Sequence, residues 1–426
     1  MLHYKSYTLQ NYKNLSRLSS VSNEDIEAIE IVGRVLPFKT NNYVVEQLID
    51  WNNIPDDPVF TLSFPRKEML YPEQYNHVKN LIDKCDKSAL AGYVNKLRMS
   101  LNPNPSGQKH NIPEIDGIKL DGMQHKYRET VLLFPKQGQN CFAFCSFCFR
   151  WPQFSNMEDL KFSMRKDLKL YLKYIRLHPE ITDVLFTGGD PVTMSCKILE
   201  DYVEPLLAPG MEHVRTIRIG TKSLSYWPYR YTTDKDADNI MRLFEKIVKS
   251  GKHLSVMAHF NHSVELSTDE VKKAINRIRS TGAQIRTQSP VLRHVNDNPD
   301  VWAAMWQKQV ELGCAPYYMF VARETGAKHF FELPLEKCQE IFRNAYQQVS
   351  GIARTARGPI MSCYFGKIQT LGVEEIAGKK VFVMRFIQGR NPDWVVRPFF
   401  AEYDPNATWI TQLKPAFGDK FFFESY

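Results

Sequence analysis

Short apolar, β-branched segments alternate with amphipathic segments over more than half of the chain, and this alternation most constrains the fold. The apolar segments span 131–134, 183–186, 216–220, 254–260, 284–290 and 316–321. The amphipathic segments span 165–177, 237–250, 268–280 and 299–312. Strands that alternate with helices form parallel sheets with right-handed crossovers. The pattern therefore predicts an α/β protein with a partial, TIM-like (βα)6 barrel, whose site lies at the carboxyl ends of its strands.

The flanking regions follow different patterns. A helix start is predicted at Ser22–Asp25 and helical structure over 71–99, and 102–107 has the composition of a linker. Alternation typical of β-hairpins returns near the end of the chain, at 380–386 and 396–402. We predict a helical region, a barrel, and a C-terminal region that closes the site and forms β-hairpins, spanning 1–110, 111–350 and 351–426.

Charge and hydropathy argue against two classes of protein, those that bind nucleic acids and those that span membranes. The net charge is +8, but the basic residues are interleaved with acidic ones, as in 265–279, instead of gathered in runs. This pattern argues against nucleic-acid binding and favours a basic cavity for an acidic small molecule. The chain has no apolar run long enough for a membrane span, and its first residues are polar. We therefore expect a cytoplasmic protein with no membrane partner.

Three cysteines with the spacing CxxxCxxC follow the first predicted strand, at Cys141, Cys145 and Cys148. Iron–sulfur cubanes usually take four cysteines, so three would leave one iron free for a small molecule. The spacing is typical of radical S-adenosylmethionine (SAM) enzymes, in which SAM chelates that iron of a 4Fe–4S cluster. A zinc site would need a fourth ligand such as the distant His125. Buried structural cysteines are the other alternative.

The second predicted strand ends in the turn Thr187–Pro191. Glycines at 188 and 189 would let the backbone approach a ligand closely. Asp190 could accept a hydrogen bond from an ammonium group. A tight turn with a helix cap is the structural alternative. Together with the cysteines, we interpret Gly188, Gly189 and Asp190 as a contact for the amino group of SAM.

Several longer motifs resemble the lysine 2,3-aminomutase family over residues 117–357. They are HKY with RETVLLF at 125–134, the cysteine block, LFTGGDPV at 185–192, IRIGTK at 217–222, AHFNH at 258–262, QSPVLRHVND at 288–297 and PYYMF at 316–320. The resemblance implies a partial barrel and a 5'-deoxyadenosyl radical. It also implies an amino acid held as an imine of pyridoxal phosphate (PLP), whose amino group moves from C2 to C3.

The resemblance assigns roles to individual residues. The three cysteines match the cluster ligands, and Arg150 aligns with the arginine that grips the α-carboxylate of the substrate. The remaining implied SAM contacts are Gln288 and Ser289 on a later strand, with Lys222 and His259 lining the same mouth. The resemblance also implies a reductant such as flavodoxin or ferredoxin, and homo-oligomers as in relatives.

Two departures from the family concern the substrate. Lysine mutases of the family hold the distal ammonium of lysine with two aspartates, but Arg323 and Ile360 stand at or near these positions. An arginine would repel an ammonium. Because relatives that act on glutamate have a basic residue at the first position, we expect an acidic, glutamate-like amino acid. A salt bridge from Arg323 to Glu324 is the alternative.

The PLP site also departs from the family. Lys367 matches the lysine that anchors PLP, but Cys363, Tyr364 and Phe365 replace glycines before it, and we expect them to crowd the cofactor. At the phosphate site, Lys126 and Thr130 replace arginines. Two alternatives therefore remain: a PLP-independent radical SAM enzyme acting on another small molecule or a peptide, and a non-enzymatic iron–sulfur or zinc protein that binds nucleic acid.

Overall fold

Seven parallel strands form the centre of a sheet of eleven strands in the computed structural model, which describes residues 2–102, 111–155 and 161–424. The parallel strands are β6 (Thr130–Leu133), β7 (Asp183–Phe186), β8 (Thr216–Thr221), β9 (His253–His259), β10 (Gln284–Val291), β11 (Ala315–Val321) and β12 (Arg357–Ser362). They pair in sequence order. The six predicted strands are all confirmed, and β12 adds a seventh.

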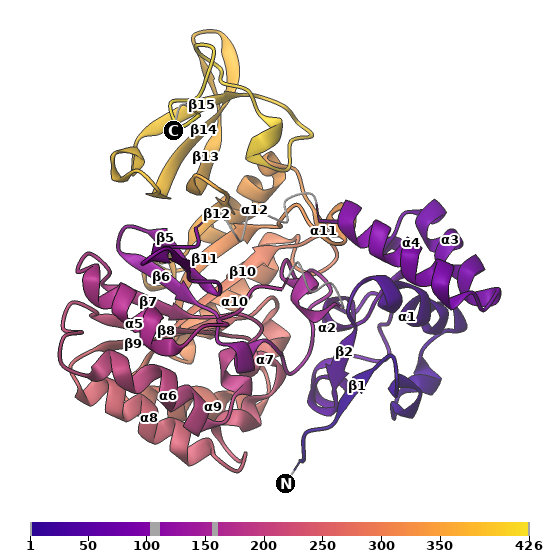
Figure 1. Ribbon diagram of the computed structural model, residues 1–426. Coiled ribbons are helices and arrows are strands. Elements are labelled where there is room, and N and C mark those ends of the chain that lie inside the picture. Colours follow the sequence, from indigo (N-terminus) through magenta and orange to yellow (C-terminus); the bar gives the residue numbers. More distant parts are fainter. Residues whose placement is uncertain (1, 103–110, 156–160, 425–426) are drawn as a thin grey trace.

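Six longer helices lie between the parallel strands in the part of the chain that the structure describes. They are α5 (Leu168–Leu177), α6 (Cys196–Leu207), α8 (Ala237–Lys249), α9 (Asp269–Ser280), α10 (Pro299–Glu311) and α12 (Leu335–Gln347). Helix α9 begins where the Thr268 side chain accepts from the backbone of Val271, and it buries apolar residues at helical spacing. Figure 1 shows α5, α6, α8 and α9 on the outer side of the sheet. The predicted partial (βα)6 barrel is confirmed.

The first hundred residues are mainly helical. They contain α1 (Asn23–Val35), α2 (Pro58–Ser63), α3 (Pro72–Asp83) and α4 (Lys87–Ser100), with a pair of short strands, β1 (Ser6–Thr8) and β2 (Lys39–Asn41). Ser22 caps α1 as predicted. The helical stretch predicted over 71–99 is two helices, because Cys85 has a φ of 54° and Asp86 caps α4. Most of the predicted linker, 103–107, lies outside the described residues.

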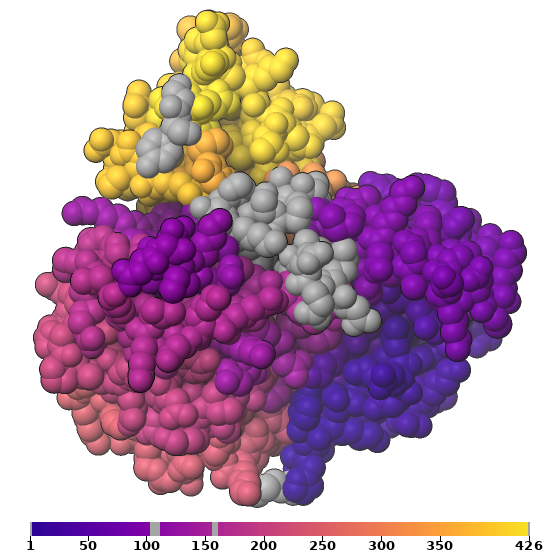
Figure 2. All heavy atoms as spheres, in the orientation of Figure 1, coloured from indigo at the N-terminus to yellow at the C-terminus, as the bar shows by residue number. Residues whose placement is uncertain are grey.

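Antiparallel strands extend the sheet at both edges. They are β5 (Met123–Tyr127) at one edge and β13 (Gly366–Ile376), β14 (Lys379–Gly389) and β15 (Pro398–Glu402) at the other. The predicted C-terminal hairpin strands correspond to β14 and β15. An aromatic cluster including Phe386, Trp394 and Phe423 fills their core. Figures 1 and 2 show these strands as a yellow lobe that projects above the barrel.

Four further elements are short. They are the hairpin β3 (Glu114–Ile115) and β4 (Ile118–Lys119), and the helices α7 (Ser223–Tyr226) and α11 (Lys328–Phe331). In the ranges that the structure describes, none of the helices combines the length and the apolar character that a bilayer crossing requires.

Candidate active site

A cavity of about 330 Å³ lies at the carboxyl ends of the parallel strands. The predicted site residues that line it are Lys126, Cys141, Cys145, Cys148, Arg150, Gly188, Gly189, Asp190, Lys222, His259, Gln288, Arg323 and Lys367. Ser289 is absent from this lining. Gln288 and Ser289 are neighbours on β10, so their side chains point to opposite faces of the sheet, and only Gln288 lines the cavity.

The three cysteines lie together on one wall of the cavity. Burial raises the pKa of the Cys141 thiol, and negative charge at Asp190 and at the other two cysteines raises it further. Cys145 Sγ donates to Tyr226 Oη at 3.8 Å. In the described part of the chain, no three His, Cys, Asp or Glu side chains are arranged to hold a single metal ion. Three thiols on one wall are the donor set that suits an iron–sulfur cluster.

The N-terminal region holds the cysteine loop (141–148) in place. The backbone amide of Phe144 donates to the Lys39 carbonyl at 2.7 Å, and that of Ser146 donates to the Leu62 carbonyl at 2.9 Å. Each of these hydrogen bonds joins residues that are far apart in sequence, so the cysteine motif alone does not reveal them. The loop is therefore supported by the N-terminal region as well as by the barrel.

The glycines after β7 pack directly against the chain that leads into the cysteine loop. A Cβ atom on Gly189 would lie 2.4 Å from the Asn140 carbonyl oxygen, and Gly188 has a φ of +144°. The backbone amide of Asp190 donates to the same Asn140 oxygen at 2.6 Å. Side chains at these two positions would separate the turn from the cysteine loop.

The Asp190 carboxylate is already engaged by the protein. It accepts from Thr221 Oγ1 at 2.7 Å, from the Lys222 backbone amide at 2.9 Å and from the Val192 amide at 3.2 Å. Burial raises the pKa of Asp190 to about 6, although these hydrogen bonds favour the charged form. The carboxylate thus joins the turns after β7 and β8. Its contact with the amino group of SAM stays a prediction.

Lys222 also has a partner within the protein. Its ammonium group pairs with the buried Glu265 carboxylate at 2.5 Å and donates to Asn261 Oδ1 at 2.9 Å. His259 lies beside it, with a buried Nε2 that has no partner among the described residues. Burial lowers the pKa of His259 well below its usual value, and the Lys222 charge lowers it further. A neutral imidazole therefore faces the cavity.

Arg150 faces the cavity with one free nitrogen. Its side chain is buried, and Nη1 has no hydrogen-bond partner among the described residues. The guanidinium carbon lies 4.2 Å from the centre of the Phe134 ring and 5.2 Å from that of Phe149. Burial lowers the pKa of Arg150 to about 9, so the group remains a cation at neutral pH. An oriented guanidinium of this kind can bind a carboxylate.

Arg323 lies in the same cavity as Arg150. Its guanidinium carbon is 5.2 Å from the Phe149 ring centre, and Nη1 donates to the Ser362 carbonyl at 2.7 Å. The neighbouring Glu324 carboxylate accepts from Thr411 Oγ1 at 3.4 Å. Burial lowers the pKa of Arg323, while the Cys363 and Glu324 charges oppose this change.

Lys367 reaches the cavity from β13. Its amine donates to Gln388 Oε1 at 2.5 Å and to Tyr127 Oη at 3.3 Å. Burial lowers the pKa of Lys367 well below its usual value, and the nearby Lys126 charge lowers it further. A neutral amine is a nucleophile, which is the property that a lysine needs to form an imine.

The expected crowding of the cofactor before Lys367 is wrong. None of the side chains at 363, 364 and 365 lines the cavity. Tyr364 is exposed, the Phe365 ring packs 4.9 Å from Phe423, and Cys363 donates to the Gly366 carbonyl. These three side chains point away from the cavity, because they pack in the aromatic core of the C-terminal lobe or are exposed to solvent.

The expected site for the PLP phosphate has less positive charge than the two arginines of the family would provide. Burial lowers the pKa of Lys126 to about 7, and the Arg323 and Arg390 charges lower it further. Thr130 donates to Asp183, which also pairs with Arg218 at 2.7 Å. Arg218 lines the cavity and was not predicted. An inward-facing arginine within an otherwise apolar strand was the signal that could have revealed it.

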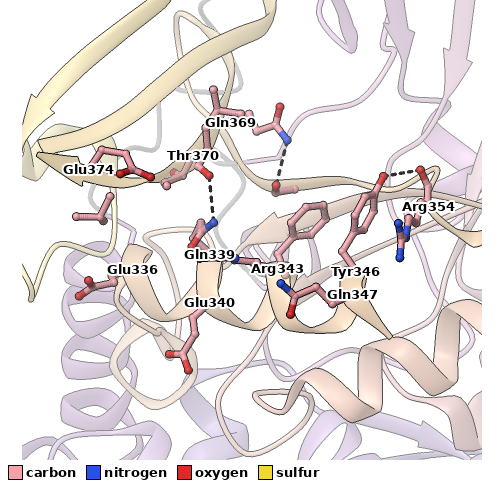
Figure 3. A pocket seen from close by; sticks show the side chains of 15 residues that line it. Glu336, Gln339, Glu340, Arg343, Tyr346, Gln347, Arg354, Gln369, Thr370 and Glu374 are labelled. Atoms are coloured by element: carbon pink, nitrogen blue, oxygen red, sulfur yellow. Dashed lines mark hydrogen bonds between the residues drawn. The ribbon is translucent and has the colours of Figure 1, made fainter. Parts of the chain in front are cut away.

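A second hollow, of about 660 Å³, lies outside the barrel between α12 and β13. Figure 3 shows its wall, where Gln339 donates to the Leu371 carbonyl, Gln369 to the Gly358 carbonyl and Tyr346 to that of Arg354. None of the predicted site residues lines it. The chemistry predicted from the sequence therefore belongs to the smaller cavity.

Known proteins resemble this chain in sequence. No protein-family model matches the chain. A putative L-lysine 2,3-aminomutase of Aquifex aeolicus is 30% identical over 398 residues, 93% of each chain. The glutamate 2,3-aminomutase of Clostridioides difficile is 25% identical over 76% of this chain and 65% of its own. A solved radical SAM methyltransferase from Sphaerobacter thermophilus covers 57% of this chain and 70% of its own, at 12% identity and a TM-score of 0.39.

A partial barrel with three cysteines at the carboxyl ends of its strands defines the class, and the protein is a radical SAM enzyme. Its length-wide similarity to the Aquifex protein is more specific. The chain belongs to the lysine 2,3-aminomutase family, whose members are isomerases that act on small molecules. The family implies a 4Fe–4S cluster and SAM.

Proposed function

We propose that the protein moves an amino group from C2 to C3 of a glutamate-like amino acid. In this proposal Arg150 binds the α-carboxylate, Arg323 binds the distal carboxylate and Lys367 anchors PLP. The glutamate 2,3-aminomutase among the relatives supports the reaction and the substrate class. The cavity itself supports the charge of the substrate.

Basic side chains outnumber acidic ones in the cavity wall. The basic side chains in the lining are Lys126, Arg150, Arg218, Lys222, Arg323, Lys328 and Lys367, and the acidic side chain in the described lining is Asp190. Three of these cations have carboxylate partners, at Asp183, Glu265 and Glu332. Among the others, the guanidinium groups of Arg150 and Arg323 would repel a further ammonium group and attract a second carboxylate.

The observation that carries the proposal is the pair of guanidinium groups beside one aromatic ring. Arg150 and Arg323 each lie 5.2 Å from the centre of Phe149. Each guanidinium group presents a planar fork that matches a carboxylate, and Nη1 of Arg150 is buried without a partner. A dicarboxylate would satisfy both arginines at once.

The remaining residues fit the cofactors. When bound, the cluster and SAM supply a radical that removes hydrogen from the substrate, and PLP supplies an aldehyde that holds the amino group. Cys141, Cys145 and Cys148 would hold the iron, and the residues at 187–190, which line the same cavity, would contact SAM. The phenyl rings in the wall exclude water from this site; they belong to Phe142, Phe144, Phe147, Phe149 and Phe154.

Turnover of glutamate and lysine by the reconstituted enzyme tests the substrate class. We expect the isomer with its amino group on C3 from glutamate and little product from lysine. Arg323→Gln should lower kcat/KM for glutamate at least about a hundredfold, because a buried charged contact contributes on the order of 3 kcal/mol.

Arg343→Gln is the matched control, since Arg343 is exposed in the second hollow. It should leave kcat/KM unchanged. Preference for lysine, or equal turnover by Arg323→Gln and wild type, would reject the acidic substrate. If borohydride captures no PLP on Lys367, the aminomutase proposal fails, and a PLP-independent radical reaction replaces it.

A further inference from the structure

The C-terminal hairpin provides half of the hydrogen bonding of Lys367. Lys367 on β13 pairs with Gln388 on β14 in the strand register. Gln388 Oε1 accepts from the lysine amine at 2.5 Å, and Tyr127 Oη on β5 accepts from it at 3.3 Å. The two acceptors therefore come from opposite edges of the parallel sheet.

A neutral amine has two hydrogens and one lone pair. When its two N–H groups donate hydrogen bonds to Gln388 and Tyr127, the lone pair of the amine remains unprotonated and free. Lys367 lines the cavity, so a lone pair free of these two contacts is available to a ligand there. An ammonium group has a third hydrogen, for which these contacts provide no acceptor.

The surroundings of the amine favour its neutral form. The charged and titratable groups that face it are Lys126 and Tyr127 on β5, Asp183 on β7, Arg218 on β8, Tyr318 on β11 and Arg357 on β12. Three of these six are cations and only Asp183 is an acid. Burial lowers the pKa of Lys367 first, and the cations lower it further.

We propose that Gln388 and Tyr127 are positioning residues. Each accepts a hydrogen bond from one hydrogen of the Lys367 amine, and together they direct the lone pair of the amine at an aldehyde in the cavity. The lone pair forms the C–N bond, and the C–O bond breaks. Both amine hydrogens leave with the carbonyl oxygen as water, and an imine remains. The identity of the aldehyde as PLP rests on the proposed function, but the orientation of the amine does not.

The amide of Gln388 is essential to this arrangement. A carboxylate at the same place would accept the same hydrogen bond but would stabilise an ammonium group. An opposite charge at this distance raises the pKa of a lysine by roughly 1–3 units. Gln388→Glu should therefore favour protonation of the Lys367 amine, while the side chain at 388 keeps its size.

Competitive acylation with acetic anhydride, read by mass spectrometry, measures the reactivity of Lys367 in the full-length, cluster-loaded protein. We expect Lys367 to react at lower pH than the exposed Lys169. Gln388→Glu should lower the reactivity of Lys367 at neutral pH at least about tenfold, which corresponds to one pKa unit.

Gln412→Glu is the matched control. Gln412 is exposed, and its Oε1 accepts from the backbones of Thr408 and Trp409, which a glutamate can also do. This variant makes the same change in charge within the same lobe and should leave Lys367 reactivity unchanged. An equal effect of the two variants would overturn the inference.

Gln388→Met provides a second test that needs no added charge. It keeps the length of the side chain but removes the acceptor, so the amine should stay neutral but lose its orientation. Capture of pyridoxal phosphate by borohydride should then slow at least about threefold, the effect of losing a hydrogen bond of about 0.7 kcal/mol. Capture at the wild-type rate would overturn the inference even if Gln388→Glu failed to fold.

The two measurements separate this inference from the proposed function. If Lys367 acylation depends on Gln388 but PLP is never captured, the positioned amine stands and the aminomutase proposal fails. If PLP is captured equally by wild type, Gln388→Glu and Gln388→Met, the cofactor assignment stands and the positioning role fails.

Discussion

The hydroxyl group of Tyr226 lies 3.8 Å from Cys145 Sγ and accepts from the thiol. A cluster-bound thiolate has no hydrogen to donate, so the hydroxyl group would then be the donor. Hydrogen bonds to cluster sulfurs stabilise the reduced state and raise the reduction potential. We expect Tyr226→Phe to shift the potential of the reconstituted cluster in the negative direction. Electron paramagnetic resonance during a redox titration measures this shift.

The neighbouring Tyr229→Phe serves as a control, because the Tyr229 ring packs against Trp227 at a distance from the cysteines. Its cluster should keep the wild-type potential. An unchanged potential in Tyr226→Phe would show that the hydroxyl group does not act on the sulfur.

Lys126 gives the ligand-free protein a pH-dependent stability. Burial lowers its pKa from 10.5 to about 7, so the folded protein loses this proton between pH 7 and 10.5 while the unfolded chain keeps it. The free energy of unfolding should therefore rise with pH in that window. We expect Lys126→Met to remove this rise, on the order of 5 kcal/mol over the full window, in denaturant titrations at several pH values.

Lys169→Met at an exposed site on α5 should keep the same pH profile as wild type. If Lys126→Met also keeps that profile, the Lys126 amine keeps its proton when the protein folds.

At the residue scale, the sequence predicted which side chains line the cavity but not their hydrogen-bond and ion-pair partners within the protein. The three cysteines, Arg150 and Arg323 all line one cavity. The hydrogen bond of Thr221 to Asp190 and the pair formed by Lys222 and Glu265 were not foreseen. They depend on contacts between loops after different strands, and no local pattern records such contacts.

At the element scale, the start of β13 is the most constrained point near Lys367. Gly366 has a φ of +153°, and a Cβ atom there would lie 2.2 Å from the Gln388 carbonyl oxygen. Gly366→Ala should therefore separate β13 from β14 and misplace the lysine. We expect borohydride capture of PLP to fall at least about tenfold, with the iron content unchanged, since a strained residue costs on the order of 1–3 kcal/mol.

Gly378→Ala, at the turn of the same hairpin, separates backbone strain from this clash. Gly378 has a φ of +73° but no atom within 4 Å of an added Cβ. The substitution should lower stability by roughly 1–2 kcal/mol and leave PLP capture intact. Equal loss of capture in both variants would mean that general loosening of the hairpin is responsible.

The strands of the barrel could be predicted because their apolar runs are regular, as the alternate burial along β8 illustrates. Strand β13 could not. Its pairing with β14 is interrupted by irregularities at Lys367–Ile368 and Thr370–Gly372, so alternation is lost. The outward turn of Phe365 was missed for a related reason, since its partner Phe423 is distant in sequence.

At the scale of the whole molecule, Asn41 joins three parts of the chain. It lies on β2, is fully buried, and its amide group donates to the carbonyls of Phe142 in the cysteine loop and Tyr226 after β8. Asn41→Leu removes the donor to the Tyr226 carbonyl and the acceptor of the Val44 amide, at a cost of about 1–3 kcal/mol each, whereas the Phe142 carbonyl still accepts from Tyr4 Oη. We expect less iron per chain after anaerobic reconstitution and a lower Tm.

Asn42→Ala is the corresponding control, because Asn42 bonds to the backbones of His3 and Lys5 within the N-terminal region. It should keep the wild-type iron content. Full iron loading by Asn41→Leu would show that the barrel alone holds the cysteine loop. The division of the chain at 110 and 350 stays a prediction, as do the reductant and the oligomeric state.

Lys367 lies on β13, beyond the last of the parallel strands, whereas the cysteines follow the first of them. The cysteines that would hold the cluster and the lysine that would hold PLP are thus mounted on separate stretches of polypeptide, which meet across the cavity. Substitutions in the hairpin can therefore alter how PLP is secured without displacing the three thiols.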